Sequence, residues 1–259
     1  FTNSNLTDTY LPSRNINNTR FVNFKGTPYN LPSSSYNQIE ISTDNNIIIG
    51  PNLDITNCNL SNQDLTGFNL TNCSLENVYL TNTVMTDVII NNTIAGPILY
   101  TSNPIVPNDY SIMVNNVNSK YLLGSNVKIH NVNFDNYHFN NMKITNIDLS
   151  KCNLSNVSFT NSYIHMIKNN YPTSLPNDYV VLGQNILGSG LLFGPGIYDN
   201  VDFVGFNLAG HNISTANFIN CKIANLTNSN AVPILNNINQ YLLTFVDTDN
   251  ITKHSVYGE

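Results

Sequence analysis

A large apolar residue returns at every fifth position over most of this sequence, and that period limits the folds open to the chain. The runs are Phe1, Leu6, Leu11, Ile16 and Phe21; Ile55, Leu60, Leu65, Leu70, Leu75, Leu80, Met85 and Ile90; Ile129, Phe134, Phe139, Ile144, Leu149, Leu154, Phe159 and Ile164; and Tyr198, Phe203, Leu208, Ile213, Phe218 and Ile223. A period of five fits neither the 3.6 residues of a helical turn nor the two-residue alternation of a simple strand. The chain is therefore expected to repeat one five-residue unit.

A second column of residues supports the same period. Two positions before each centre, the first long run has Leu53, Cys58, Gln63, Phe68, Cys73, Val78, Thr83 and Val88, and the second has Val127, Val132, Tyr137, Met142, Ile147, Cys152, Val157 and Ser162. These residues are mostly apolar or small. The position before the centre is usually Asn or Asp, and the position after it is usually Ser or Thr.

The segments 58–62 (CNLSN), 68–72 (FNLTN) and 152–156 (CNLSN) resemble the pentapeptide-repeat motif, which reads small residue, Asn/Asp, Leu/Phe, Ser/Thr, any residue. The resemblance covers roughly half of the chain directly, and most of it when the connecting segments are included. It implies an all-β fold, a right-handed four-sided β-solenoid with one pentapeptide on each side. It also implies that the centre and the residue two before it point inward.

Elementary physics agrees with that fold. Coils stacked at about 4.8 Å pair their backbone groups with the coils above and below, and such repeats become stable only when several coils stack. The sequence holds 51 asparagines, about one residue in five. Because asparagine tolerates turn geometry and bonds to nearby backbone, we expect much of it at the corners. About seven coils would account for the runs.

Three related segments interrupt the runs. Each has a Pro shortly before a Tyr (Pro32 and Tyr36, Pro107 and Tyr110, Pro176 and Tyr179), and each ends in an apolar triplet followed by Gly50, Gly124 or Gly194. The expected turns are Asp44-Asn45-Asn46, Asn115-Asn116 and Gly188-Ser189-Gly190. We interpret the segments as β-hairpin insertions, which either protect coil edges from aggregation or bind a partner.

This interpretation divides a single solenoid into alternating blocks. They are a partial coil block at 1–25, a hairpin linker at 26–50, a coil block at 51–95, a hairpin linker at 96–124, a coil block at 125–167, a hairpin linker at 168–196, a coil block at 197–230 and a terminal cap or tail at 231–259. The opening run is already in register at Phe1, which predicts further chain upstream.

A search for reactive groups yields no catalytic, cofactor-binding or metal-binding residue. All four cysteines (Cys58, Cys73, Cys152 and Cys221) occupy the column two before the centre, so we expect buried free thiols; their spacing fits no zinc motif. Of the histidines, His130, His138 and His165 should face outward, His211 should face inward, and His254 lies in the last segment. The pairs Asp199/Asp202 and Asp247/Asp249, and the glycines at 188–196, match no catalytic or phosphate-binding motif.

Charge and hydropathy exclude further classes. Only 10% of residues are charged and the net charge is −6, with no basic patch for nucleic acid. No apolar run approaches the roughly 18 residues of a membrane span. Since Phe1 is not an initiator methionine, we expect the chain to be processed or part of a longer protein.

We therefore expect a non-enzymatic structural or interaction protein, a rigid rod that braces or cements a larger assembly. Its partner would be a repetitive shell or scaffold subunit, and it could self-associate through hairpins or coil ends. Low charge with abundant Asn and Ile resembles the usage of AT-rich genomes and favours a minor capsid protein of a large DNA virus, in the virion rather than secreted. The alternatives are a DNA-mimic inhibitor of a type II topoisomerase, as in some pentapeptide-repeat proteins, and a secreted adhesin or an ice- or glycan-binding solenoid.

Overall fold

The computed structural model describes residues 1–11, 16–115, 117–167, 169–177, 179–182, 184–188 and 191, and beyond them the backbone of five strands. The described part is all-β and contains no helix, so it holds no helical segment that could cross a membrane. The chain divides into two compact units, Phe1–Ile129 and His130–Glu259.

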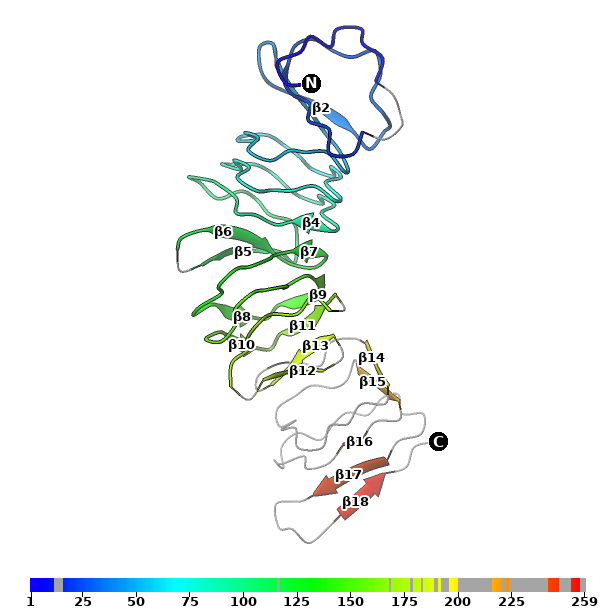
Figure 1. Ribbon diagram of the computed structural model, residues 1–259, viewed down its shortest axis with the longest axis vertical. Helices are drawn as coiled ribbons and strands as arrows, with labels where there is room; N and C mark the ends of the chain where they lie inside the picture. The colour runs from blue at the N-terminus through cyan, green and yellow to red at the C-terminus, as the bar shows by residue number, and fades with distance from the viewer. Residues whose placement is uncertain are drawn as a thin grey trace. The chain divides into compact units, whose positions relative to one another are not determined.

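The first unit is built from a chain that returns beside itself every 20 residues. Asn59 forms a parallel bridge with Tyr79, and Tyr79 forms one with Leu99. The Leu60 amide donates to the Tyr79 carbonyl at 2.9 Å, and the Tyr79 amide donates to the Cys58 carbonyl at 2.9 Å. Twenty residues are four pentapeptides, as the resemblance implied. Figure 1 shows these turns of the chain stacked above and below one another in the cyan part of the unit.

Seven strands accompany the turns of the first unit. They are β1 (Val22–Phe24), β2 (Asn37–Ser42), β3 (Asn45–Ile49), β4 (Thr93–Ile94), β5 (Ser111–Val114), β6 (Lys120–Leu123) and β7 (Val127–Lys128). The consecutive strands β2 and β3 pair antiparallel, as do β5 and β6. In contrast, β4 pairs with β7 in parallel.

The second unit keeps the same 20-residue register. Its strands are β8 (His138–Asn140), β9 (Lys143–Ile147), β10 (Ser158–Thr160), β11 (Tyr163–Met166), β12 (Val180–Leu182), β13 (Asn185–Leu187), β14 (Gly196–Asp199), β15 (Ala216–Ile219), β16 (Lys222–Ile223), β17 (Leu242–Val246) and β18 (Lys253–Val256). Phe139 pairs with Phe159 in parallel, and Tyr198 pairs with Phe218. The register reaches β17, where Ile223 pairs with Leu243, although the sequence pattern there no longer shows the period.

The core consists of the two columns expected to point inward. In the described residues every centre from Ile55 to Ile90 and from Ile129 to Ile164 is buried. The column two before it is mostly buried as well. The exceptions are Gln63, Phe68, Tyr137 and Met142, which are half-buried; each has a longer side chain than the Cys, Val, Thr and Ser that fill most buried places in this column.

Hydroxyl groups in the inward column two before the centre donate hydrogen bonds to backbone carbonyls of the preceding coil. The hydroxyls of Thr83 and Thr93 donate to the carbonyls of Leu60 and Leu70 at 2.8 Å, and Ser162 donates to Phe139 at 3.0 Å. Each pair is 23 residues apart. A buried hydroxyl with such a partner escapes the cost of an unsatisfied polar group, which explains how a polar residue fits an inward column.

Asparagine lies at the corners, as predicted. In the block with centres Ile55 to Ile90, the residue two after each centre has a positive φ, between 54° and 61° at the seven non-glycine corners from Asn57 to Asn92. Six of these seven are Asn, one is Asp, and the eighth corner is Gly67 with a φ of 73°. Left-handed backbone costs most residues energy but is readily adopted by Gly, Asn and Asp, so the fold itself demands much of the asparagine.

The three interrupting segments contain the antiparallel pairs β2–β3, β5–β6 and β12–β13. The first reversal lies between Ser42 and Asn45, so of the expected first turn it contains Asp44, while Asn45 and Asn46 belong to β3. The second lies between Val114 and Lys120, the interval that contains Asn115. The expected position of the third turn was wrong. The chain reverses between Leu182 and Asn185, whose Cα atoms pair, and not at Gly188-Ser189-Gly190. The apolar residues that lead to a glycine here are Ile186 and Leu187 before Gly188; positions 192–194 lie outside the described residues. The right-handed, four-sided course and the block boundaries stay predictions.

Candidate functional site

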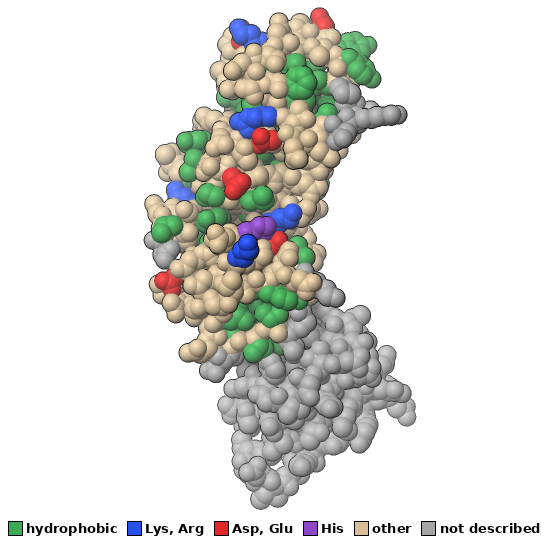
Figure 2. All heavy atoms as spheres, viewed as in Figure 1, with side chains coloured by type: hydrophobic (Ala, Val, Ile, Leu, Met, Phe, Trp, Pro, Cys, Tyr) green, Lys and Arg blue, Asp and Glu red, His purple; other side chains and the backbone are tan. Residues whose placement is uncertain are grey.

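The described surface is polar and carries few charges. In Figure 2 most of it is tan, the colour of uncharged polar side chains and backbone, and Lys, Arg, Asp and Glu are scattered among it. The side chains that precede the centres are held by their own backbone. The Asp54 carboxylate accepts the amide of Thr56 at 3.0 Å, and the Asn59 amide oxygen accepts that of Ser61 at 3.0 Å.

Asp64 shows the electrostatic consequence of this arrangement. Its carboxylate accepts both the amide and the hydroxyl of Thr66, at 2.9 and 2.6 Å. These bonds favour the charged form and lower the pKa of Asp64. The carboxylate is thus an ionised turn-closing group, without the raised pKa of a general acid.

Corner amides form rows along the stacked coils. Asn72 Nδ2 donates to Asn52 Oδ1 at 2.8 Å, Asn82 donates to Asn62 at 3.1 Å, and Asn92 donates in turn to Asn72. In the second unit Asn161 donates to Asn141 at 2.8 Å. Each step spans 20 residues, so the rows repeat at the spacing of the coils. The surface of both units therefore carries side-chain amide groups that repeat at the coil spacing.

The cysteines lie where the sequence predicted them, as far as the structure describes them. Cys58, Cys73 and Cys152 are buried thiols outside any disulfide, and Cys221 falls outside the described residues. Burial raises the pKa of Cys58 and Cys73 to about 11 and that of Cys152 to about 12. Such thiols stay protonated at neutral pH, which makes them poor nucleophiles and poor metal ligands.

The histidines have structural partners. His130 is exposed and its Nε2 lies 2.8 Å from the buried Asp148 carboxylate, which also accepts the Ser150 amide. His138 is exposed and its Nδ1 lies 2.6 Å from the Ser158 hydroxyl on the adjacent strand. Among the described residues no group of three or more His, Cys, Asp or Glu could hold a metal ion.

His165 differs from the expectation. It was predicted to face outward, yet it is half-buried, because β13 pairs beside it and places Asn185 opposite. This burial lowers the pKa of the His165 imidazole. The side chains of His211, His254, Asp199, Asp202, Asp247 and Asp249 lie outside the described residues.

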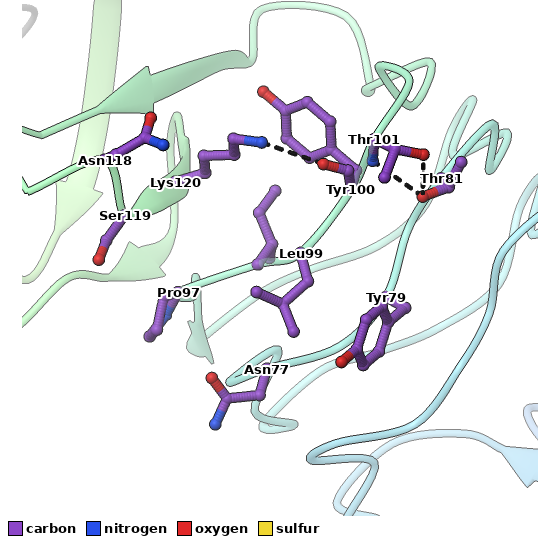
Figure 3. Close-up of a pocket in the computed structure, with 11 residues that line it drawn as sticks. Asn77, Tyr79, Thr81, Pro97, Leu99, Tyr100, Thr101, Asn118, Ser119 and Lys120 are labelled. Atoms are coloured by element: carbon purple, nitrogen blue, oxygen red, sulfur yellow. Dashed lines mark hydrogen bonds between the residues drawn. The ribbon is translucent and has the colours of Figure 1, made fainter.

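A groove lies beside the antiparallel pair β5–β6. It has a volume of about 460 Å³, and Figure 3 shows how residues of the coils and residues of the β5–β6 segment face one another across it. Tyr79, Thr81 and Leu99 come from the coils, and Ser119 and Lys120 come from the β6 side. This groove, which we call the Tyr79 groove, was missed by the sequence reasoning.

A sequence signal for the groove nevertheless exists. The column before the centre carries Asp54, Asn59, Asp64, Asn69 and Ser74 and then changes to Tyr79, Val84, Ile89 and Ile94. Tyr79 and Ile89 are exposed. An aromatic or aliphatic residue in an outward column cannot serve the turn-closing role of Asn or Asp, so the change of residue type marks a different use of that surface.

A second hollow of about 320 Å³ lies in the same unit and has a different character. Its lining includes Asp54, Asn72, Asn92 and Lys128. Arg20 lies 3.5 Å from Asp54, and the corner amides of Asn72 and Asn92 bond to each other. Its polar groups are therefore largely engaged with one another.

Comparison with known families agrees with the geometry. The model for pentapeptide repeats matches residues 54–92 in eight copies, the block whose turns stack at the 20-residue register. No curated protein matches the chain. With the motif, the register and the buried columns in accord, residues 54–92 of this chain form a block of pentapeptide repeats.

Proposed function

We propose that the chain is a structural protein whose repeats form a right-handed, four-sided β-solenoid that braces or cements a larger repetitive assembly. The observation that carries this proposal is the set of corner amide rows, in which Asn52, Asn72 and Asn92 repeat one polar group every 20 residues. Pentapeptide-repeat proteins are in general non-enzymatic interaction proteins, which supports the same conclusion.

The chemistry of this surface favours an extended partner. A single neutral hydrogen bond contributes only about 0.5–1.5 kcal/mol net, so a surface made of amides and hydroxyls gains useful affinity only by engaging many of them. A partner whose own groups repeat along its surface can do so. The coils are suited to such a brace, because stacked backbone hydrogen bonds resist bending and the amide spacing is fixed by them.

In its most specific form, we propose a minor capsid or cement protein of a large DNA virus, with the shell subunit as partner. The Asn- and Ile-rich, low-charge composition supports this choice. A DNA mimic would instead need dense rows of carboxylates. In the outward column from Asp54 to Ile89 only Asp54 and Asp64 are acidic, which gives that alternative little support.

The experiment is cross-linking mass spectrometry on native particles or extracts that contain the protein. Because Lys and Arg together number only 10, a photo-activated cross-linker placed at exposed coil positions is better than a lysine reagent. Suitable positions are the exposed Asn91 in the first unit and Asn140 in the second, neither of which is a left-handed corner. Cross-links to an abundant repeating subunit are expected, and disrupted particles provide the control. Cross-links to a topoisomerase, or to no assembly subunit, would contradict the proposal.

A further inference from the structure

The Tyr79 groove differs chemically from the amide rows. Its uncharged polar side chains are Asn77, Tyr79, Thr81, Tyr100, Thr101, Asn118 and Ser119. They are joined by the apolar Pro97, Ile98 and Leu99 and by one cation, Lys120. No carboxylate is in this lining, although the chain as a whole has a net charge of −6. The volume of about 460 Å³ is within the usual range for small-molecule sites.

The backbone at the groove is already paired. The Leu99 amide donates to the Val78 carbonyl at 2.9 Å, and the Leu80 amide donates to the Leu99 carbonyl at 2.8 Å. The Ile98 amide donates to the Lys120 carbonyl at 2.7 Å. A peptide strand that needs free backbone groups of the sheet therefore finds none at these residues. Recognition here must use side chains.

Tyr79 supplies a flat apolar surface at the groove. Its side chain is 48% exposed, and the half-buried Leu99 follows it in the next coil. Figure 3 shows Leu99 between Tyr79 on one side and Lys120 on the other. An aromatic face beside an aliphatic floor suits the C–H face of a sugar ring. The surrounding amides and hydroxyls each donate and accept, as sugar hydroxyls require.

Lys120 is held in place by Tyr100. Its Nζ donates to the Tyr100 carbonyl at 3.0 Å and lies 3.8 Å from the centroid of the Tyr100 ring. Neither partner neutralises the ammonium group, which has three donors. A carboxylate on the ligand would complete its coordination. We infer that the Tyr79 groove binds an acidic saccharide, with a pyranose ring on Tyr79 and a carboxylate at Lys120, a ligand site beyond the structural role proposed above.

The test uses the full chain and a matched pair of probes, tri-galacturonate and its fully methyl-esterified, neutral form. Calorimetry measures affinity, and saturation-transfer NMR shows which ligand protons contact the protein. We expect the acid to bind at least about tenfold more tightly than the ester, since only the acid can accept a charge-assisted hydrogen bond from Lys120. Raising the salt concentration should weaken binding of the acid.

Three variants locate the site. Tyr79→Ala should lower affinity about tenfold or more, whereas Tyr79→Phe keeps the ring and should bind within about twofold of the parent. Lys120→Met should remove the preference for the acid. Tyr29→Ala is the matched control, since Tyr29 is 78% exposed and outside the groove lining. Failure of both probes to bind at millimolar concentration, equal affinity for both, or full binding by folded Tyr79→Ala would overturn the inference.

Discussion

Three positions of the typical pentapeptide fulfil three physical requirements. The centre fills the core, an Asn or Asp before it closes a turn with its side-chain oxygen, and the residue two after it adopts left-handed backbone. The sequence predicted the first role from the period alone. It did not show which column has the positive φ, because the motif treats its fifth position as variable. Here that position is mostly Asn, since an exposed left-handed corner favours it.

Lys151 occupies a corner with positive φ although it is not Gly, Asn or Asp, so it tests whether left-handed corners favour those residues. It is exposed and has a φ of 62°, a conformation that costs a side chain such as lysine about 1 kcal/mol relative to Gly or Asn. Lys151→Asn should therefore raise the free energy of unfolding by up to about 1 kcal/mol, measured by urea denaturation. Lys143→Asn makes the same chemical change in strand β9 and should give no such gain. Equal effects of the two substitutions would contradict the corner explanation.

Leu70 tests the inward column. It is fully buried at a centre of the first unit, and Phe139 is its counterpart in the second. Leu70→Asp or Phe139→Asp places a carboxylate among apolar side chains, at a cost of several kcal/mol. We expect loss of the β signal in circular dichroism or a melting transition lower by many degrees. Asn69→Asp, one position away and directed outward, is the control; melting of Leu70→Asp like the parent would refute the assignment.

At the scale of elements, one contact recurs in all three interrupting segments, those that contain β2–β3, β5–β6 and β12–β13. A tyrosine ring packs on a glycine so closely that a Cβ atom on Gly50, Gly124 or Gly188 would lie 2.1–2.2 Å from a ring carbon. The hydroxyl of Tyr110 also donates to the Ser125 carbonyl, one residue past Gly124. The sequence indicated the tyrosines and the glycine endings but not their contact, which depends on how the chain folds back.

The spacing between the tyrosine and the glycine in this contact explains why the third turn was predicted at the wrong position. Tyr36 and Tyr110 each precede their glycine by 14 positions, and Gly194, the expected third ending, follows Tyr179 by 15 positions. The third pair is shorter, and Tyr179 packs on Gly188 after nine positions. An apolar pair followed by glycine occurs at both places, and sequence pattern alone does not distinguish them.

A double-mutant cycle tests the Tyr110–Gly124 contact. Gly124→Ala forces a Cβ against the ring and should cost about 1–3 kcal/mol, as overpacking does. Tyr110→Ala removes the ring and is itself destabilising. The double variant should be more stable than the sum of the two losses predicts, because the clash is gone. Additive losses in urea denaturation would show that the contact does not limit the size of residue 124.

At the scale of the whole molecule, both units use one rule, a 20-residue return. The sequence showed the five-residue period, and the resemblance to pentapeptide repeats implied four such units in each turn. It appears as Asn59–Tyr79 in the first unit and as Phe139–Phe159 in the second. The Tyr79 groove could not be predicted in the same way. It depends on where β6 comes to lie beside the coils, and that placement follows from the Ile98–Lys120 bridge rather than from the period.

Alkaline pH should weaken the units through their buried thiols. Cys58 and Cys73 have a pKa of about 11 and Cys152 of about 12, against an ordinary value of 9.0. Below pH 9 both states keep the proton and nothing is lost. Above pH 9 the unfolded thiols ionise while the folded ones do not, so the unfolded state is favoured by up to about 1.4 kcal/mol per pH unit for each thiol.

The measurement is the urea midpoint between pH 8 and 10. This window ends at the ordinary tyrosine pKa of 10.0, above which Tyr110, whose pKa burial raises to about 12, would add a slope of its own. The midpoint should fall steeply above pH 9. In a variant with Cys58, Cys73 and Cys152 changed to alanine, stability at pH 8 should be lower because packing is lost, yet the slope should be much flatter. Since the thiols lie in both units, single substitutions should each remove part of the slope. An unchanged slope in the triple variant would mean that groups other than these thiols govern the alkaline transition.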